Sequence, residues 1–381
     1  MKTTYESNSP PQSQELGLPP AHLIAISEKM YFPTLDGLRF FAFLLVFVHH
    51  LPRSTEPILA LLHDQGWVGV HVFLFLSAYL LTAILRAEQH ANGTISIRNF
   101  YIRRGLRIWP LYFIFCVGAF VLQYYRQPQL PTEWFRLGGL MMFLDNIITG
   151  LRGYNPISHT AHLWTISLEE QFYLVLPLLL VGLITIPTRL LSGLFALWVL
   201  FVGVRIFAVL FQAPHPMIWT SVFSADSLLL GTALGVKRPS PPSPVFARIM
   251  IVIVGIVALF SGALMPPIDE IGTHQVIVYS LIAVGAAALT TAALHEPFLG
   301  FLKERPLRYL GKISYGLYVF HLLGIAIGSS VATQIESESY WVSALAAFAA
   351  TTFLSVLSYE LFERQFLKLK HRFETVHSRP I

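Results

Sequence analysis

The sequence has 381 residues, of which 54% are hydrophobic and only 12% are charged. A soluble domain normally carries about twice that charge, roughly 25%, so the composition excludes an ordinary water-soluble enzyme. The formal net charge of +5 does not indicate nucleic-acid binding, because the positions of the basic residues have a membrane explanation. Cys116 is the only cysteine, so no disulfide can form within the chain.

The first 30 residues are polar and include four prolines. They lack the basic-then-apolar order of a signal peptide, so we expect a disordered cytoplasmic segment at residues 1–33. A transmembrane domain is expected over residues 34–370, and a cytoplasmic tail over 371–381.

From residue 37 onward, apolar runs recur with about the 20 residues that a helix needs to cross a bilayer. Backbone groups in hydrocarbon must pair within their own segment. The expected fold class is therefore all-α, a polytopic bundle of about ten transmembrane helices. The expected spans are 37–51, 66–86, 106–125, 166–186, 190–211, 217–236, 246–266, 275–295, 313–333 and 341–363.

The segment 134–150 is apolar but short, and Gly138, Gly139 and Asp145 interrupt it. If it does not cross the membrane, both termini are cytoplasmic and 21 of the 26 basic residues lie on the cytoplasmic side. That distribution follows the positive-inside rule, whereas a crossing at 134–150 would invert it downstream. We therefore expect a short re-entrant or interfacial helix here.

Charged residues inside membrane helices cost about 2.5–3.5 kcal/mol each and so suggest functional sites. In the first span Arg39 and His50 are eleven residues apart. This spacing is about three turns plus 20°, so both lie on one helix face, roughly 16 Å apart, whereas His49 lies about 80° off that face. A cation and an imidazole on one face suit an anionic donor and a general base. The alternative is that each residue only lies in a headgroup region.

Three arginines stand at the cytoplasmic end of the third span. Arg104 and Arg107 are three residues apart and share a helix face, with Arg103 beside them. Arginine pairs bind phosphate through parallel hydrogen bonds, so these residues are candidates for binding a phosphorylated ligand. Anchoring of the span by positive charge explains the same pattern.

Two adjacent carboxylates, Glu169 and Glu170, stand at the start of another span. We expect one of them to orient His50 or to hold a substrate hydroxyl. Charge complementarity with the helix N-terminus, worth under about 1 kcal/mol, explains one carboxylate better than both.

Two further polar groups are expected inside the bundle. Arg205 and Asp226, on neighbouring spans, are interpreted as a structural ion pair. Ser314 and His321 are seven residues apart and therefore share a helix face.

The order of these motifs resembles the acyltransferase 3 family of membrane O-acyltransferases over about residues 35–370. The matching segments are Leu35 to Arg39 followed by His50, Gly69 to Ala78, Arg104 to Pro110, Trp164 to Tyr173, Ile313 to His321, and Glu363-Arg364. His71, Leu74 and Ala78 depart from the family pattern, and Gln365 replaces a proline after the last motif.

This resemblance implies that the donor is an acyl-CoA, by default acetyl-CoA, and that the acceptor is a hydroxyl of a carbohydrate. It also implies a bacterial cell membrane as the location, with no metal or nucleic acid as a partner. Some family members add an extracytoplasmic hydrolase-like domain, which we do not expect because the chain ends soon after its last span. The implied roles are catalysis for His50, Arg39, Glu169 and Glu170; donor binding for Arg39, Arg103, Arg104 and Arg107; and substrate binding for Ser77, Trp164, Tyr173, Ser314, Tyr315 and His321.

In the expected mechanism His50 deprotonates the acceptor hydroxyl, which attacks the thioester. A covalent acyl intermediate on His50 or Ser77 is an alternative. A transporter or flippase also uses charges near the membrane midplane, but the paired halves typical of transporters are not evident. A non-catalytic scaffold is a third interpretation.

Overall fold

The computed structural model describes residues 30–126, 134–153, 155–211, 225–237, 244–265, 272–295 and 297–376. Within these ranges the regular structure is helical and no strand occurs, which confirms the all-α prediction. Nearly all of the predicted N-terminal segment, at residues 1–29, and the last five residues of the predicted tail lie outside the described part.

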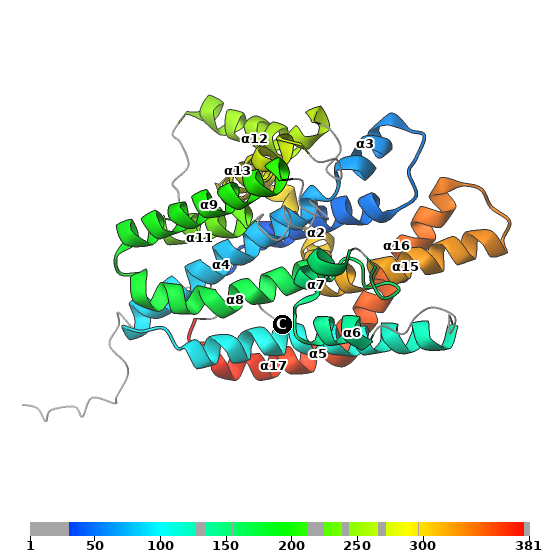
Figure 1. Ribbon diagram of the computed structural model, residues 1–381, viewed down its shortest axis with the longest axis horizontal. Coiled ribbons are helices and arrows are strands. Elements are labelled where there is room, and N and C mark those ends of the chain that lie inside the picture. The colour runs from blue at the N-terminus through cyan, green and yellow to red at the C-terminus, as the bar shows by residue number, and fades with distance from the viewer. Residues whose placement is uncertain are drawn as a thin grey trace, which may run out of the picture.

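The helices pack as one elongated bundle (Figure 1). In chain order they are α2 (Pro33–His50), α3 (Pro57–Gln65), α4 (Val68–Asn92), α5 (Ile97–Arg126), α6 (Trp134–Met141), α7 (Asp145–Arg152), α8 (Trp164–Leu183), α9 (Pro187–Leu210), α11 (Asp226–Lys237), α12 (Val245–Leu259), η1 (Ser261–Leu264), α13 (His274–His295), η2 (Pro297–Lys303), α14 (Arg305–Lys312), α15 (Ser314–Gln334), α16 (Tyr340–Ser358), η3 (Tyr359–Glu363), α17 (Arg364–Lys370) and η4 (His371–Phe373).

Seven helices of the described chain are long and apolar enough to cross a membrane: α4, α5, α8, α9, α13, α15 and the continuous run Tyr340–Phe373. These coincide with seven of the ten predicted spans. The predicted spans 37–51 and 246–266 correspond to α2, with 18 residues, and α12, with 15. Of 217–236, only the part in α11 lies within the described residues. The chain is a multi-pass integral membrane protein, and the count of ten stays a prediction.

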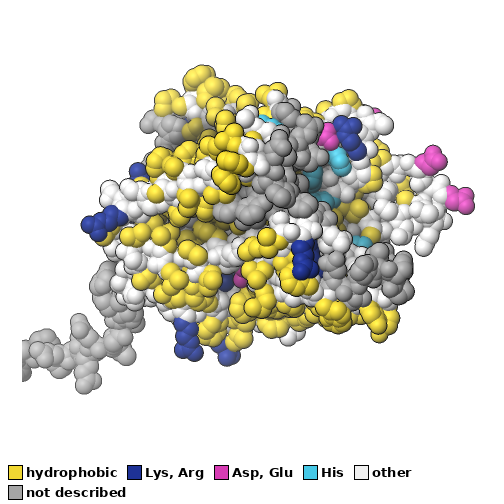
Figure 2. All heavy atoms as spheres, in the orientation of Figure 1, with side chains coloured by type: hydrophobic (Ala, Val, Ile, Leu, Met, Phe, Trp, Pro, Cys, Tyr) yellow, Lys and Arg dark blue, Asp and Glu magenta, His cyan; other side chains and the backbone are white. Residues whose placement is uncertain are grey.

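Burial separates the centre of the bundle from its lipid-facing edge. In the most apolar 18-residue stretch of α4, 72% is buried, whereas in the corresponding stretch of α9 only 17% is buried. Several exposed side chains of α9, such as Phe195, Phe207 and Leu210, are large and apolar. Hydrophobic side chains also cover much of the face drawn in Figure 2. An exposed apolar surface of this kind fits lipid rather than water.

The predicted re-entrant segment forms two short helices, α6 and α7, instead of one spanning helix. Arg136 on α6 lies 3.0 Å from Asp145 on α7 and donates a hydrogen bond to Thr149. These buried contacts join the two helices into a compact turn beside α5 and α8.

Helix α2 lies at the centre of the bundle and contacts α3, α4, α13, α14, α15 and η2. The close approach depends on Gly311 of α14, because a side chain there would collide with the backbone carbonyl of Asp36. The residues of the first family-like motif are therefore held at the junction of several elements.

Candidate functional site

A cavity opens between α2, α4, α5, α8, α15 and the end of α17. Its polar lining residues are Tyr31, Asp36, Arg39, Ser77, Arg104, Arg107, Thr165, Glu169, Tyr173, Ser314, Tyr315, Tyr318 and Lys370. Segments more than 300 residues apart in the chain thus line one cavity, since Tyr31 lies just before α2 and Lys370 ends α17, which packs against α5.

Four cationic side chains line this cavity: Arg39, Arg104, Arg107 and Lys370. Two carboxylates, Asp36 and Glu169, lie among them, so the formal charge of the lining is positive. Asp36 accepts hydrogen bonds from Tyr31, at 2.9 Å, and from Arg39, at 3.2 Å. A cavity with excess arginine and lysine suits a ligand with several phosphates.

Arg104 and Arg107 share the cavity-facing side of α5, as their spacing predicts. The Arg104 guanidinium lies over the ring of Tyr173 on α8, 5.8 Å from its centroid. Tyr173 in turn donates a hydrogen bond to Glu169. Aromatic stacking and a nearby carboxylate restrict the guanidinium to one region of the wall.

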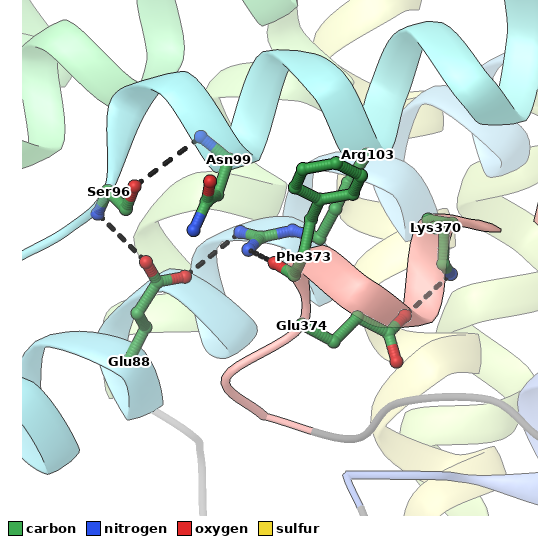
Figure 3. Close-up of polar contacts among 7 residues, drawn as sticks. All are labelled: Glu88, Ser96, Asn99, Arg103, Lys370, Phe373 and Glu374. Atoms are coloured by element: carbon green, nitrogen blue, oxygen red, sulfur yellow. Dashed lines mark hydrogen bonds and ion pairs between the residues drawn. The ribbon is translucent and has the colours of Figure 1, made fainter.

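Arg103 faces a different side of α5 and does not line the cavity. One of its guanidinium nitrogens lies 2.9 Å from the Glu88 carboxylate of α4, and the other donates to the carbonyl of Phe373 at 2.8 Å (Figure 3). Both side chains of this ion pair are buried. The Arg103 guanidinium is therefore bound to other residues of the protein and not turned toward the cavity. These contacts hold the C-terminal segment against α4 and α5.

At the other end of α2, two histidines from distant helices meet. His50 Nδ1 lies 3.3 Å from His321 Nε2 on α15 and 2.8 Å from the carbonyl of Val46. His321 Nδ1 lies 2.6 Å from the carbonyl of Tyr318. Since a carbonyl can only accept, each Nδ1 carries the proton, and in a neutral ring Nε2 has the free lone pair. His50 Nε2 is therefore able to accept a proton.

His50 and His321 do not line the cavity, whereas Tyr318 does, and its ring packs against the His321 ring with centroids 5.6 Å apart. The Tyr318 hydroxyl contacts Thr165 Oγ1 at 2.5 Å and donates to the His162 carbonyl at 2.9 Å. The His162 and His321 rings also pack together, with centroids 4.5 Å apart. Burial lowers the pKa of His162 well below its usual value, so this ring is neutral at neutral pH.

The two predicted carboxylates point to different partners. Glu169 lines the cavity, whereas Glu170 accepts a hydrogen bond from Trp109 Nε1 at 2.9 Å. Among the described hydrogen bonds, the side-chain partner of His50 is His321 and neither glutamate. His162 and Tyr318 belong to the sequence motifs, but the motifs predict no role for them. His162, just before α8, meets Tyr318 and His321 of α15 only in the folded bundle.

Of the residues predicted to bind substrate, four line the cavity: Ser77, Tyr173, Ser314 and Tyr315. Trp164 and His321 do not line it. Tyr315 donates a hydrogen bond to the carbonyl of Ile108, at 2.8 Å, which fixes α15 against α5. Lys370, which lies outside the family-like motifs, belongs to the same wall.

The ion pair between Arg205 and Asp226 is present, with nitrogen and oxygen 3.0 Å apart, and both side chains are buried. Asp226 also accepts hydrogen bonds from Trp198 Nε1 and Ser280 Oγ. This network joins α9, α11 and α13 and lies away from the basic cavity, as expected for a structural pair. Within the described residues, no group of three His, Cys, Asp or Glu side chains is arranged to hold a metal ion.

Comparison with known proteins adds a family and several relatives. A family model described as an acyltransferase domain matches residues 32–360. The chain is 26% identical over 359 residues to the peptidoglycan O-acetyltransferase OatA of Listeria monocytogenes, covering 88% of this chain and 56% of the relative. It is 28% identical to the putative peptidoglycan O-acetyltransferase YrhL of Bacillus subtilis, with 88% and 54% covered.

The O-acetyltransferase OatA of Staphylococcus aureus is also 28% identical, over 364 residues, with 88% of this chain and 58% of the relative covered. The chain therefore spans a little over half the length of the curated relatives it matches. No solved structure matches it.

Proposed function

Because this chain belongs to the acyltransferase 3 family of membrane O-acyltransferases, we propose that it transfers an acyl group, by default acetyl, from acyl-CoA to a hydroxyl of a cell-envelope glycan. The observation that carries the proposal is the arrangement of α2, which presents Arg39 to a basic cavity and carries His50 beyond it. The names of the relatives, which refer to peptidoglycan, support a glycan as the acceptor.

The donor docks with its phosphates against the cationic wall. Arg104 and Arg107 bind them, and Arg39 lies along the path of the pantetheine arm. The placement of basic residues along the sequence supports a cytoplasmic position for this end of the bundle, with both termini on that side. This orientation gives the cavity access to cytoplasmic acyl-CoA.

The transfer step uses His50 as general base. Its Nε2 takes the proton of the acceptor hydroxyl while the hydroxyl oxygen attacks the thioester carbonyl. The tetrahedral intermediate expels the CoA thiolate, which receives the proton from the imidazolium, so the products are an ester and free CoA. Tyr318 lines the cavity and packs against His321, the neighbour of His50, so we propose that this side chain moves when the donor binds. Glu169 holds the donor arm or the acceptor on the cavity side.

A covalent route through Ser77 is the alternative for the chemical step, because this hydroxyl lines the cavity. It predicts that the protein acquires one acetyl group on incubation with acetyl-CoA alone, detectable by intact-protein mass spectrometry. Direct transfer predicts no such adduct.

The test is release of free CoA by the purified protein in detergent, where no gradient exists. Acetyl-CoA with a soluble peptidoglycan fragment as the acceptor is expected to give free thiol and O-acetylated glycan. His50→Ala is expected to abolish this transfer while retaining CoA binding. Undiminished transfer by a folded His50→Ala protein would refute the proposed base. Glycan movement across proteoliposomes without thiol release would instead support a transporter.

A further inference from the structure

The end of α17 brings a lysine into the basic wall of the cavity. Lys370 is 8% exposed and lines the cavity together with Arg39, Arg104 and Arg107. Its ammonium lies 2.9 Å from the carboxylate of Glu374. Glu374 lines a small neighbouring pocket and does not line the main cavity. Lys370 and Arg104 line both spaces and thus lie on the partition between them.

From this position we propose that Lys370 is a further cationic ligand for a phosphate of the donor. Without the donor, Glu374 is the counter-ion of Lys370, and the donor phosphate competes with Glu374 for the ammonium. The inference rests on the proposed function, since it takes acyl-CoA as the ligand of the cavity. It adds to the proposed donor site a residue outside the arginine motif. It also adds a competition between the Glu374 carboxylate and the donor phosphate for the Lys370 ammonium.

The electrostatic reason is the concentration of like charge in a buried site. A buried ammonium beside arginines is costly unless an anion compensates it. Glu374 supplies that anion from outside the cavity. Burial raises the pKa of Glu374, but attraction to Lys370 and His371 outweighs this effect, so its pKa lies below the usual value of a glutamate. Glu374 is therefore ionised at neutral pH.

The pair can separate without leaving the carboxylate alone. The second oxygen of Glu374 lies 2.6 Å from His371 Nδ1, so a hydrogen-bond partner remains when the lysine turns away. The lysine side chain is a flexible chain of four carbons, so its ammonium can move from the side of Glu374 to the side of the main cavity. A phosphate oxygen in the cavity then takes the place of the Glu374 carboxylate oxygen as the partner of the Lys370 ammonium.

The backbone around Glu374 is braced, so the carboxylate keeps its place while the lysine moves. Arg103 is paired with Glu88 and donates to the carbonyl of Phe373, the residue before Glu374 (Figure 3). Ser96 at the start of α5 donates its backbone N–H to the same Glu88, at 2.8 Å. The position of the counter-ion is thus set by α4 and α5, the elements that also carry cavity residues.

The experiment measures binding of CoA to the purified full chain in detergent by isothermal titration. Lys370→Met is expected to weaken CoA binding about tenfold, the size expected for one lost charge-assisted hydrogen bond. Lys368→Met is the matched control, because Lys368 is exposed on the same helix and lines no cavity described here. Glu374→Gln is expected to tighten binding about threefold, because the lysine loses its competing partner.

The double variant Lys370→Met with Glu374→Gln is expected to bind like Lys370→Met alone, since removal of the counter-ion matters only through the lysine. Pantetheine, which has no phosphate, is expected to bind all four variants equally. Thermal unfolding of each variant shows that it is folded.

Two outcomes would overturn the inference. One is CoA affinity in Lys370→Met equal to that of Lys368→Met, and the other is a Glu374→Gln effect that persists without the lysine. If either occurs while Arg104→Ala weakens CoA binding, only the role of Lys370 fails. If the folded wild-type protein binds no CoA, the proposed function fails with it.

Discussion

The imidazoles of His50 and His321 lie 3.3 Å apart, although 271 positions separate them in the chain. The carbonyls of Val46 and Tyr318 set the same tautomer in both rings, with the proton on Nδ1. His50 Nδ1–H therefore has two acceptors, the Val46 carbonyl and His321 Nε2, and His50 Nε2 keeps its lone pair. In this pair a neutral histidine takes the orienting position that a carboxylate occupies in many catalytic triads.

The first prediction concerns His321 as a positioning residue. His321→Ala is expected to lower kcat by roughly 10- to 100-fold, less than the loss of the general base itself, with little change in the KM for acetyl-CoA. His321→Gln is expected to restore part of the rate, because its amide oxygen can accept the same hydrogen bond. Steady-state kinetics measure both.

His90→Ala serves as the control, since His90 is an exposed histidine at the end of α4. An unchanged kcat in His321→Ala, in a protein that His50→Ala inactivates, would contradict the prediction. So would a change confined to the KM for the donor.

The second prediction separates donor binding from membrane anchoring. Arg104→Gln and Arg107→Gln together are expected to weaken CoA binding at least 100-fold, because each arginine provides a charge-assisted contact worth about 1.5–3 kcal/mol. Arg98→Gln on the same helix is exposed and outside the cavity, so it is expected to have no effect. Titration calorimetry with CoA distinguishes them. Equal affinities in the two proteins would show that these arginines only anchor the span.

The third prediction assigns Arg103 a structural role. Arg103→Gln leaves the buried Glu88 without its cation, a loss that typically costs 3–5 kcal/mol. We expect a clear fall in the thermal unfolding temperature and a smaller effect on CoA affinity than that of Arg104→Gln. Combining it with Glu88→Gln is expected to recover part of the stability. A stable Arg103→Gln protein that has lost CoA binding would assign Arg103 to the donor after all.

The fourth prediction concerns the ion pair of Arg205 and Asp226. Asp226→Ala removes the anion from a buried guanidinium and is expected to destabilise the fold by about 3–5 kcal/mol. Glu360→Ala, in the exposed pair with Arg364, is expected to change stability by less than about 1 kcal/mol. Thermal unfolding in detergent compares the two. Equal shifts would mean that the Arg205 pair lies in a wetter environment than its burial indicates.

Much of the site can be predicted within single helices. The eleven-residue spacing of Arg39 and His50 gives their common face because the helical period is fixed by backbone hydrogen bonds. The i, i+3 relation of Arg104 and Arg107 follows for the same reason, and both line the cavity. Charge alone does not distinguish the neighbouring Arg103 from these two arginines. Its different role is seen only in the folded structure, where it contacts Glu88 and the carbonyl of Phe373.

The class of the protein follows from composition and hydropathy, because long apolar segments with few charges leave a helical membrane bundle as the stable arrangement. The sequence also places the reactive side chains along each helix. Which of them meet depends on the tertiary structure: His321 lies beside His50, Tyr318 beside His162, and Lys370 among the arginines. These contacts join segments far apart in the chain, and packing of the helices, which no local periodicity encodes, brings them together.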